Sequence, residues 1–154
     1  QNIELWCISF ACEECMRGSK RFVKRHLDEL KDSKTINLDM IGEGTVSIIS
    51  AEPYFTAWHS KELAKDFQES TKRANVEMPI KVLKFGGSDS ANFSKKKHEA
   101  ISIFGLTPKD HPSTWHEMAD TPEIIDEKLL ENTLKAIIQY LEDLDDYKYN
   151  MFID

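Results

Sequence analysis

The stretch Thr35-Ile-Asn-Leu-Asp-Met-Ile-Gly-Glu-Gly-Thr-Val-Ser-Ile-Ile-Ser50 holds the pattern that decides the fold. Its two runs of mostly β-branched and apolar residues, 35–41 and 45–50, are typical of strands. Gly42-Glu-Gly44 separates the runs, and two glycines permit a tight reversal of the chain. The sequence therefore predicts two successive strands joined by a short turn.

Three more strands are expected around this pair. Ile3–Phe10 is a run of apolar, β-branched and aromatic residues, as in a central strand that is buried on both faces. Ile80–Phe85 and Ala100–Phe104 have a similar composition, and the glycine-bearing loop Gly86-Gly-Ser-Asp-Ser90 lies between them.

Helices are predicted between these strands from apolar residues at three-to-four spacing. One begins near Ser19, a second covers Ser60 to Asn75, and a long closing helix begins near Asp126. Strands that alternate with helices indicate the α/β class. We expect a three-layer α/β/α domain with a mixed, largely parallel central sheet.

Composition narrows the class of protein. The 154 residues are 40% hydrophobic and 31% charged, which suits one globular domain. A formal net charge of -7 argues against a nucleic-acid binder, because phosphate contacts rely on clustered Lys and Arg. The basic run Lys20, Arg21, Lys24 and Arg25 is interpreted as a solvated helix face. No apolar stretch approaches the roughly 20 residues that span a bilayer, so no membrane partner is expected.

The amino-terminal end and the cysteines bear on the origin of the chain. Gln1 leads at once into the first predicted strand, so we expect that preceding sequence is missing. The cysteines are Cys7, Cys12 and Cys15, and an odd number argues against a secreted disulfide framework. This slightly favours the cytoplasm, although localisation stays open.

Two adjacent carboxylates, Glu13 and Glu14, follow the first predicted strand. Ligands of open α/β sheets collect in the loops after the carboxyl ends of strands. Neighbouring carboxylates repel, and such a pair is tolerable when a cation neutralises one member while the other moves protons. The ordinary alternative is a solvated loop pair.

Asp39 and His116 are two further candidates. Asp39 lies inside an apolar predicted strand, where an acid needs a metal, a charged partner or backbone donors. His116 lies in the loop between the last predicted strand and the last helix, and histidine is the commonest metal ligand. The other histidines are expected to be surface residues: His26, His59, His98 and His111.

Taken in chain order, five short motifs between Ile3 and Leu144 resemble the co-catalytic di-zinc aminopeptidase family. The motifs are Glu13-Glu14 after a strand, Gly18-Ser19 opening a helix, Asn37-Leu-Asp-Met-Ile-Gly42, Gly87-Ser-Asp89 with Phe93, and Trp115-His116 with Asp120-Thr121-Pro122.

The resemblance implies a zinc-dependent exopeptidase that hydrolyses amino-terminal peptide bonds. In the family a metal-bound water attacks the peptide and a glutamate serves as base. Glu13 matches that base, Glu14 and His116 match ligands of one zinc, and Asp39 matches a ligand of the other. Asp89 matches an aspartate that lines the site and contacts the substrate or the ligands. Ser90 follows it, where the family often has His or Tyr.

The family's first histidine ligand and its metal-bridging aspartate precede the glutamate pair. Residues 1–154 are therefore expected to be the carboxyl-terminal part of a single zinc-peptidase domain, with the amino-terminal part absent. The resemblance implies two zinc ions in the intact enzyme and an incomplete site in this chain. A missing segment or a partner chain would complete it.

Three other functions stay open. The same scaffold could carry a single-zinc aminoacyl cyclase similar to glutaminyl cyclase, or a non-catalytic interaction domain. Cys12-Glu-Glu-Cys15 could be a redox pair. A four-cysteine zinc site would need a second pair, which Cys7 alone does not supply. These cysteines are interpreted as packing residues beside the site.

Overall fold

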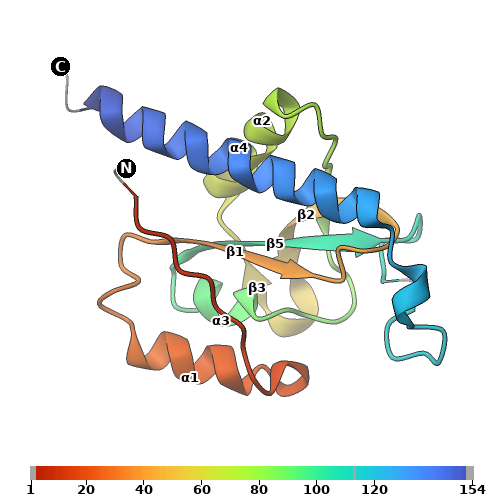
Figure 1. The fold of residues 1–154 in the computed structure, drawn as a ribbon. Coiled ribbons are helices and arrows are strands. Elements are labelled where there is room, and N and C mark those ends of the chain that lie inside the picture. Colours follow the sequence, from red (N-terminus) through yellow and green to blue (C-terminus); the bar gives the residue numbers. More distant parts are fainter. Residues whose placement is uncertain (1–2, 113, 152–154) are drawn as a thin grey trace.

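The computed structural model describes residues 3–112 and 114–151, without the side chains of residues 147–151. A central sheet lies between two layers of helices (Figure 1). Helices α2 and α4 cover one face, and α1 and α3 cover the other. This confirms the predicted α/β class. The helices are α1 (Arg17–Arg25), α2 (Lys61–Arg73), α3 (Ser90–Ser94) and α4 (Glu127–Met151), with short 3-10 turns η1 (Glu13–Cys15), η2 (Pro53–Phe55) and η3 (Pro122–Ile124).

The described part of the sheet has five strands in the order β1-β5-β2-β3, with β4 also paired to β2. Pairs β1–β5 and β2–β4 are parallel, whereas β2–β5 and β2–β3 are antiparallel. The sheet is therefore mixed, and β2 and β4 run opposite to β1 and β5. The strands are β1 (Lys34–Asp39), β2 (Thr45–Glu52), β3 (Ala57–Trp58), β4 (Ile80–Val82) and β5 (Glu99–Leu106).

Alternation along β5 divides the core into two halves. Ile101 and Ile103 face α2 and α4, where they pack with Phe67 and Tyr140. Ala100 and Phe104 face the opposite side and belong to the two clusters there. Every residue from Ala100 to Leu106 is buried, as expected of a strand covered on both faces.

Local signals explain the helix boundaries. The Ser60 hydroxyl accepts a hydrogen bond from the Leu63 amide at 3.1 Å, so Ser60 caps α2. The start of α4 is tied to the sheet, because the Asp126 amide donates to the Gly42 carbonyl at 2.8 Å. Helix α1 ends at Arg25, so Leu27 and Leu30, which would continue its apolar spacing, lie beyond it.

The prediction of a buried central strand at Ile3–Phe10 is wrong for this structure. The segment is irregular, and its side chains are exposed or partly exposed, including Leu5, Trp6 and Ile8. Strand character requires a neighbour that accepts the backbone hydrogen bonds. Within the described residues, this segment pairs with no strand, and β1 pairs only with β5. Phe10 alone reaches the core, against Phe22 and Phe93.

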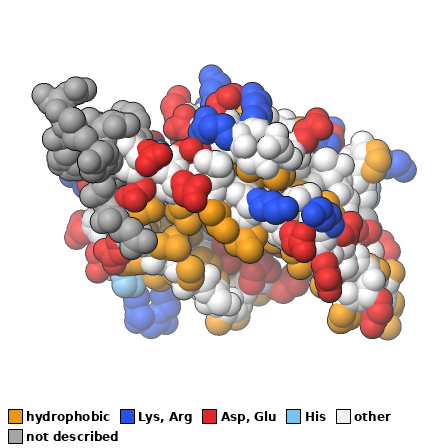
Figure 2. All heavy atoms as spheres, turned by 45° about the horizontal axis from the view of Figure 1, so that its top comes forward, with side chains coloured by type: hydrophobic (Ala, Val, Ile, Leu, Met, Phe, Trp, Pro, Cys, Tyr) orange, Lys and Arg blue, Asp and Glu red, His pale blue; other side chains and the backbone are white. Residues whose placement is uncertain are grey.

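Helix α4 leaves part of its apolar surface uncovered. Leu130, Leu134 and Ile138 follow at four-residue spacing, and each is more than a third exposed. Figure 2 shows hydrophobic side chains gathered on this side of the molecule, bordered by acidic ones. Among the described helices, none combines the length and the apolarity needed to cross a bilayer.

Gly105 allows β5 to lie close beneath the turn between β1 and β2. A side-chain carbon at this position would overlap the carbonyl oxygens of Met40 and Glu43. The same turn contains Gly42, where an added carbon would touch only the Ile125 side chain. Backbone atoms cannot move aside as a side chain can, so the two glycines differ in tolerance.

We expect Gly105→Ala to destabilise the fold by about 1–3 kcal/mol, the usual cost of overpacking a core. Gly42→Ala serves as the matched control in the same turn and should cost less than about 1 kcal/mol. Urea unfolding followed by circular dichroism measures both changes. Equal unfolding midpoints for the two variants would contradict the close packing described for β5.

Candidate functional site

The glutamate pair lies in a tight turn that leads into α1. Glu13 and Glu14 begin η1, and residues with left-handed backbone flank the turn, Cys12 at φ 57° and Met16 at φ 48°. The Met16 amide donates to the Glu13 carbonyl and thereby closes the turn. Both carboxylates are exposed, as a role in binding or catalysis requires.

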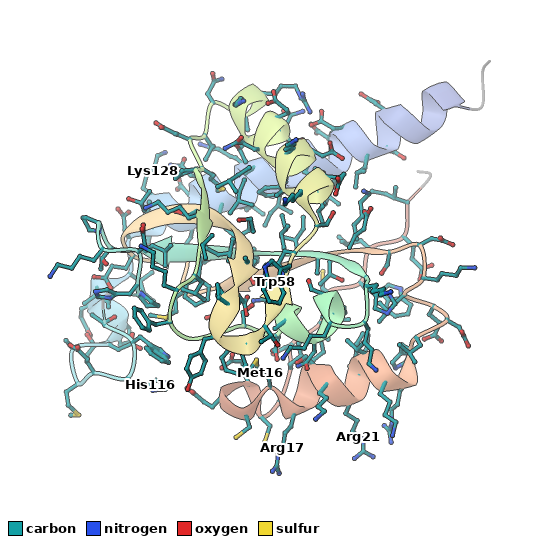
Figure 3. The ribbon with its side chains drawn as sticks, turned by 180° about the vertical axis from the view of Figure 1, so that it is seen from behind. Met16, Arg17, Arg21, Trp58, His116 and Lys128 are labelled. Atoms are coloured by element: carbon teal, nitrogen blue, oxygen red, sulfur yellow. The ribbon has the colours of Figure 1, made fainter. Side chains whose placement is uncertain are left out.

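His116 meets this turn from the far end of the sequence. Its Nε2 lies 2.9 Å from Oε2 of Glu14, across 102 positions of chain. The His116 backbone is left-handed, with φ 60°, and its ring lies 4.4 Å from that of Trp115. Figure 3 shows His116 at the same end of the molecule as Met16 and the start of α1. The structure thus brings together the predicted base, Glu13, and two of the predicted metal ligands.

Asp39 ends β1 and is half-buried. Its pKa is raised from 3.8 to about 7, chiefly by burial and further by the nearby charges of Glu13 and Asp89. Glu52 and Glu14 contribute in the same direction. The four carboxylates therefore lie within electrostatic range of Asp39, and this end of the sheet concentrates negative charge.

Asp89 is buried and ties the two helices of the lower layer together. The Ser19 hydroxyl of α1 donates to its carboxylate. Asn92 of α3 donates to Ser19 Oγ at 2.8 Å and to the Met16 carbonyl at 3.0 Å. Burial raises the pKa of Asp89, the Ser19 hydrogen bond lowers it, and the charge of Glu52 raises it.

Glu13 has the electrostatic surroundings of a proton carrier. Partial burial raises its pKa, as do the charges of Asp89 and Glu14, whereas His116 lowers it. A carboxylate whose pKa rises toward the working pH exchanges protons more readily. The arrangement therefore places a carboxyl group of raised pKa, Glu13, beside the contact between Glu14 and His116.

Metal-ligand geometry is only partly formed. Among the residues that the structure describes, no three His, Cys, Asp or Glu side chains converge as a group that could hold a metal. Glu14 and His116 form one pair of donors, and Asp39 is a separate donor nearby. Asp89 is engaged by Ser19.

The structure corrects two further predictions. His59, expected at the surface, is buried and lies 3.1 Å from Glu52, which the sequence analysis did not single out. The signal was available, because Glu52 ends an apolar strand just as Asp39 does. The cysteines were expected to pack beside the site, but Cys7, Cys12 and Cys15 are free and exposed.

Comparison with solved structures gives the same fold at low sequence identity. The LapA aminopeptidase of Legionella pneumophila superposes with a TM-score of 0.68 at 16% identity, covering 84% of this chain and 36% of LapA. The zinc aminopeptidase BSAP of Bacillus subtilis gives 0.67 at 18% identity, covering 84% of this chain and 32% of BSAP. LapB of Legionella pneumophila gives 0.70 at 20% identity, covering 88% of this chain and 38% of LapB.

The chain thus spans 32–38% of the length of these neighbours. Comparison with curated protein sequences gave no match. The sequence profile of peptidase family M28, however, matches residues 2–141, which is most of the chain. On this match and the shared fold, the chain belongs to peptidase family M28.

Proposed function

We propose that this chain is part of a zinc-dependent aminopeptidase, which hydrolyses the amino-terminal bond of peptides. The observation that carries the proposal is the contact between Glu14 and His116 beside Glu13. A carboxylate and an imidazole so distant in sequence meet at 2.9 Å. The family match and the zinc aminopeptidase BSAP among the structural neighbours support the same activity.

The donor chemistry fits zinc. Zn²⁺ takes histidine nitrogen and carboxylate oxygen as ligands, and Glu14 with His116 offers one of each. When bound, zinc polarises a carbonyl and lowers the pKa of water. Asp39 would hold a second ion, because a bound cation would favour the ionised form of its carboxylate among the acidic neighbours.

Glu13 would move the protons. It is not paired with His116 as Glu14 is, so it is free to take a proton from the attacking water. The same carboxyl would then deliver that proton to the departing amine. Asp89 would keep Ser19, and with it the start of α1, in the position that presents the glutamate pair.

The remaining metal donors would come from polypeptide outside this sequence. Catalytic zinc usually takes three protein ligands plus water, and the described residues gather two at Glu14 and His116. A preceding segment or a partner chain would supply the others. The uncovered apolar side chains of 5–8 and of α4 give such a polypeptide a surface on which to pack.

The roles of Glu13 and His116 are separable in the complete natural protein. Glu13→Gln should lower turnover of a free dipeptide amide by about 10²–10⁴-fold, the usual contribution of a proton-transfer group, with zinc content unchanged. His116→Ala should lower zinc content measured by atomic emission. Equal zinc loss in both variants would mean that base and ligand are exchanged.

The substrate class has its own control. An N-acetylated peptide should resist cleavage, whereas the same peptide with a free amino terminus should lose its first residue. An amino-terminal glutamine peptide that loses ammonia without hydrolysis would indicate a cyclase instead. Absence of zinc and of turnover from the wild-type protein would leave the interaction-domain and redox alternatives.

Residues 1–154 alone should bind zinc weakly, because one carboxylate and one imidazole make a partial set of ligands. Calorimetric titration is expected to show micromolar or weaker binding that His116→Ala removes. His111→Ala is the matched control, since this partly buried histidine bonds the Pro112 carbonyl and lies outside the site. Two tight sites in the isolated chain would contradict the assignment of ligands.

Asp39 should make the metal-free protein less stable as the pH rises. Its folded pKa of about 7 lies above the usual 3.8, so its stabilising contribution is complete in acid and is lost as the pH rises through 7. Asp39→Asn should therefore raise the free energy of unfolding at pH 8 by on the order of 2 kcal/mol, less than the full shift implies because the group is partly exposed.

This gain should shrink as the pH falls toward 4. Urea unfolding in the presence of a chelator measures it, and the exposed Asp32→Asn is the control of equal charge change. A pH-independent difference between wild type and Asp39→Asn would contradict the acidic surroundings described for Asp39.

A further inference from the structure

Glu52 is a fully buried carboxylate that the proposed mechanism does not use. Its side chain, at the end of β2, has no exposed surface. The Ser88 amide donates to Oε2 at 2.9 Å, and the Ser88 hydroxyl donates to Oε1 at 2.5 Å. Ser90 Oγ and His59 Nε2 lie 3.3 and 3.1 Å from Oε1. A carboxylate so buried is maintained only by such a set of partners.

These partners form one connected network beneath the sheet. The hydroxyls of Ser88, Ser90 and Ser102 lie 2.5 to 2.8 Å from one another. Asn37 of β1 donates to Ser102 Oγ at 3.3 Å, two residues before Asp39. The network therefore reaches from the buried end of β2 to the strand that carries a proposed zinc ligand.

A second branch of the network leads to the glutamate pair. Ser88 and Ser90, both held by Glu52, flank Asp89 in sequence. Asp89 accepts a hydrogen bond from Ser19 near the start of α1, which follows η1 directly. Glu52 thus holds the segment 88–90. Through the contact between Asp89 and Ser19, this segment is linked to the turn that bears Glu13 and Glu14.

The serine, histidine and glutamate are not arranged as a second hydrolytic site. Ser88 and Ser90 are completely buried, so no substrate reaches their hydroxyls. His59 contacts Glu52 through Nε2 and Ser94 of α3 through Nδ1, and it follows Trp58, which is labelled in Figure 3. A serine nucleophile would need a hydrogen bond to the imidazole. Ser88 instead donates its hydroxyl directly to the Glu52 carboxylate.

We propose that Glu52 is a positioning residue, which acts through Ser88, Asp89 and Ser19 to hold the Glu13–Glu14 turn in its working geometry. The catalytic part of this inference rests on the proposed peptidase function. The mechanical link between Glu52 and the turn does not. Glu52→Gln is the sharpest probe, because the amide keeps the volume of the carboxyl but presents a donor where the partners already donate.

Activity of the complete natural protein is the first measurement. Glu52→Gln should lower kcat about 10–100-fold, as loss of supporting contacts does around metal sites, and leave KM within about twofold. Phe67→Leu, a buried change on the opposite face of the sheet, is the control for lost stability. If both variants unfold at similar temperatures and keep equal kcat, the positioning role is overturned.

Hydrogen exchange of the zinc-free protein is the second measurement and needs no activity. In Glu52→Gln, exchange should accelerate more than tenfold at the amides of Ser88 and Asn92, and also at Met16 and Arg17 in the glutamate turn. Phe67→Leu should leave these four amides unchanged. Acceleration confined to Ser88 and Asn92 would overturn the link to the glutamate pair. Inactive wild-type protein with acceleration at all four amides would refute the peptidase function and support the link.

Discussion

The pairing of β5 on both edges and the burial of both its faces is the constraint on which the rest of the structure depends. Strands β1 and β2 attach to it, and each helical layer packs against one set of its alternating side chains. Close packing of this kind leaves no room for adjustment, which explains why Gly105 runs directly under backbone oxygens. Strand β1 pairs with β5 and ends at Asp39. The core strand therefore also fixes the position of the acidic end of the sheet.

Electrostatics at that end oppose folding in the absence of a cation. The pKa values of Asp39, Glu13 and Asp89 are all raised, and burial contributes to the shift of each. Acidic groups with pKa values raised in this way tend to lie at functional sites, because gathering them does not stabilise the fold. The Ser19 hydroxyl, which Asn92 holds in place, donates to Asp89 and offsets some of this cost there.

Sequence patterns predicted the α/β class, the helix from Ser60 and the long closing helix, because propensity and periodicity are local. They also singled out Glu13, Glu14, Asp39 and His116, whose roles stay predictions. They failed where the answer depends on a neighbour. Ile3–Phe10 has the composition of a central strand, yet composition does not say which strand it pairs with. His59 was expected at the surface, because its partner Glu52 was not recognised as buried.

The contact between Glu14 and His116 joins the two helical layers around the end of the sheet. Glu14 is carried by the turn that leads into α1 below, whereas His116 belongs to the segment that leads into α4 above. A ligand that binds both side chains therefore links the two layers. At a concentration a hundredfold above its Kd, such a ligand raises the free energy of unfolding by about 2.7 kcal/mol. Binding at this site and unfolding of the domain are therefore linked equilibria.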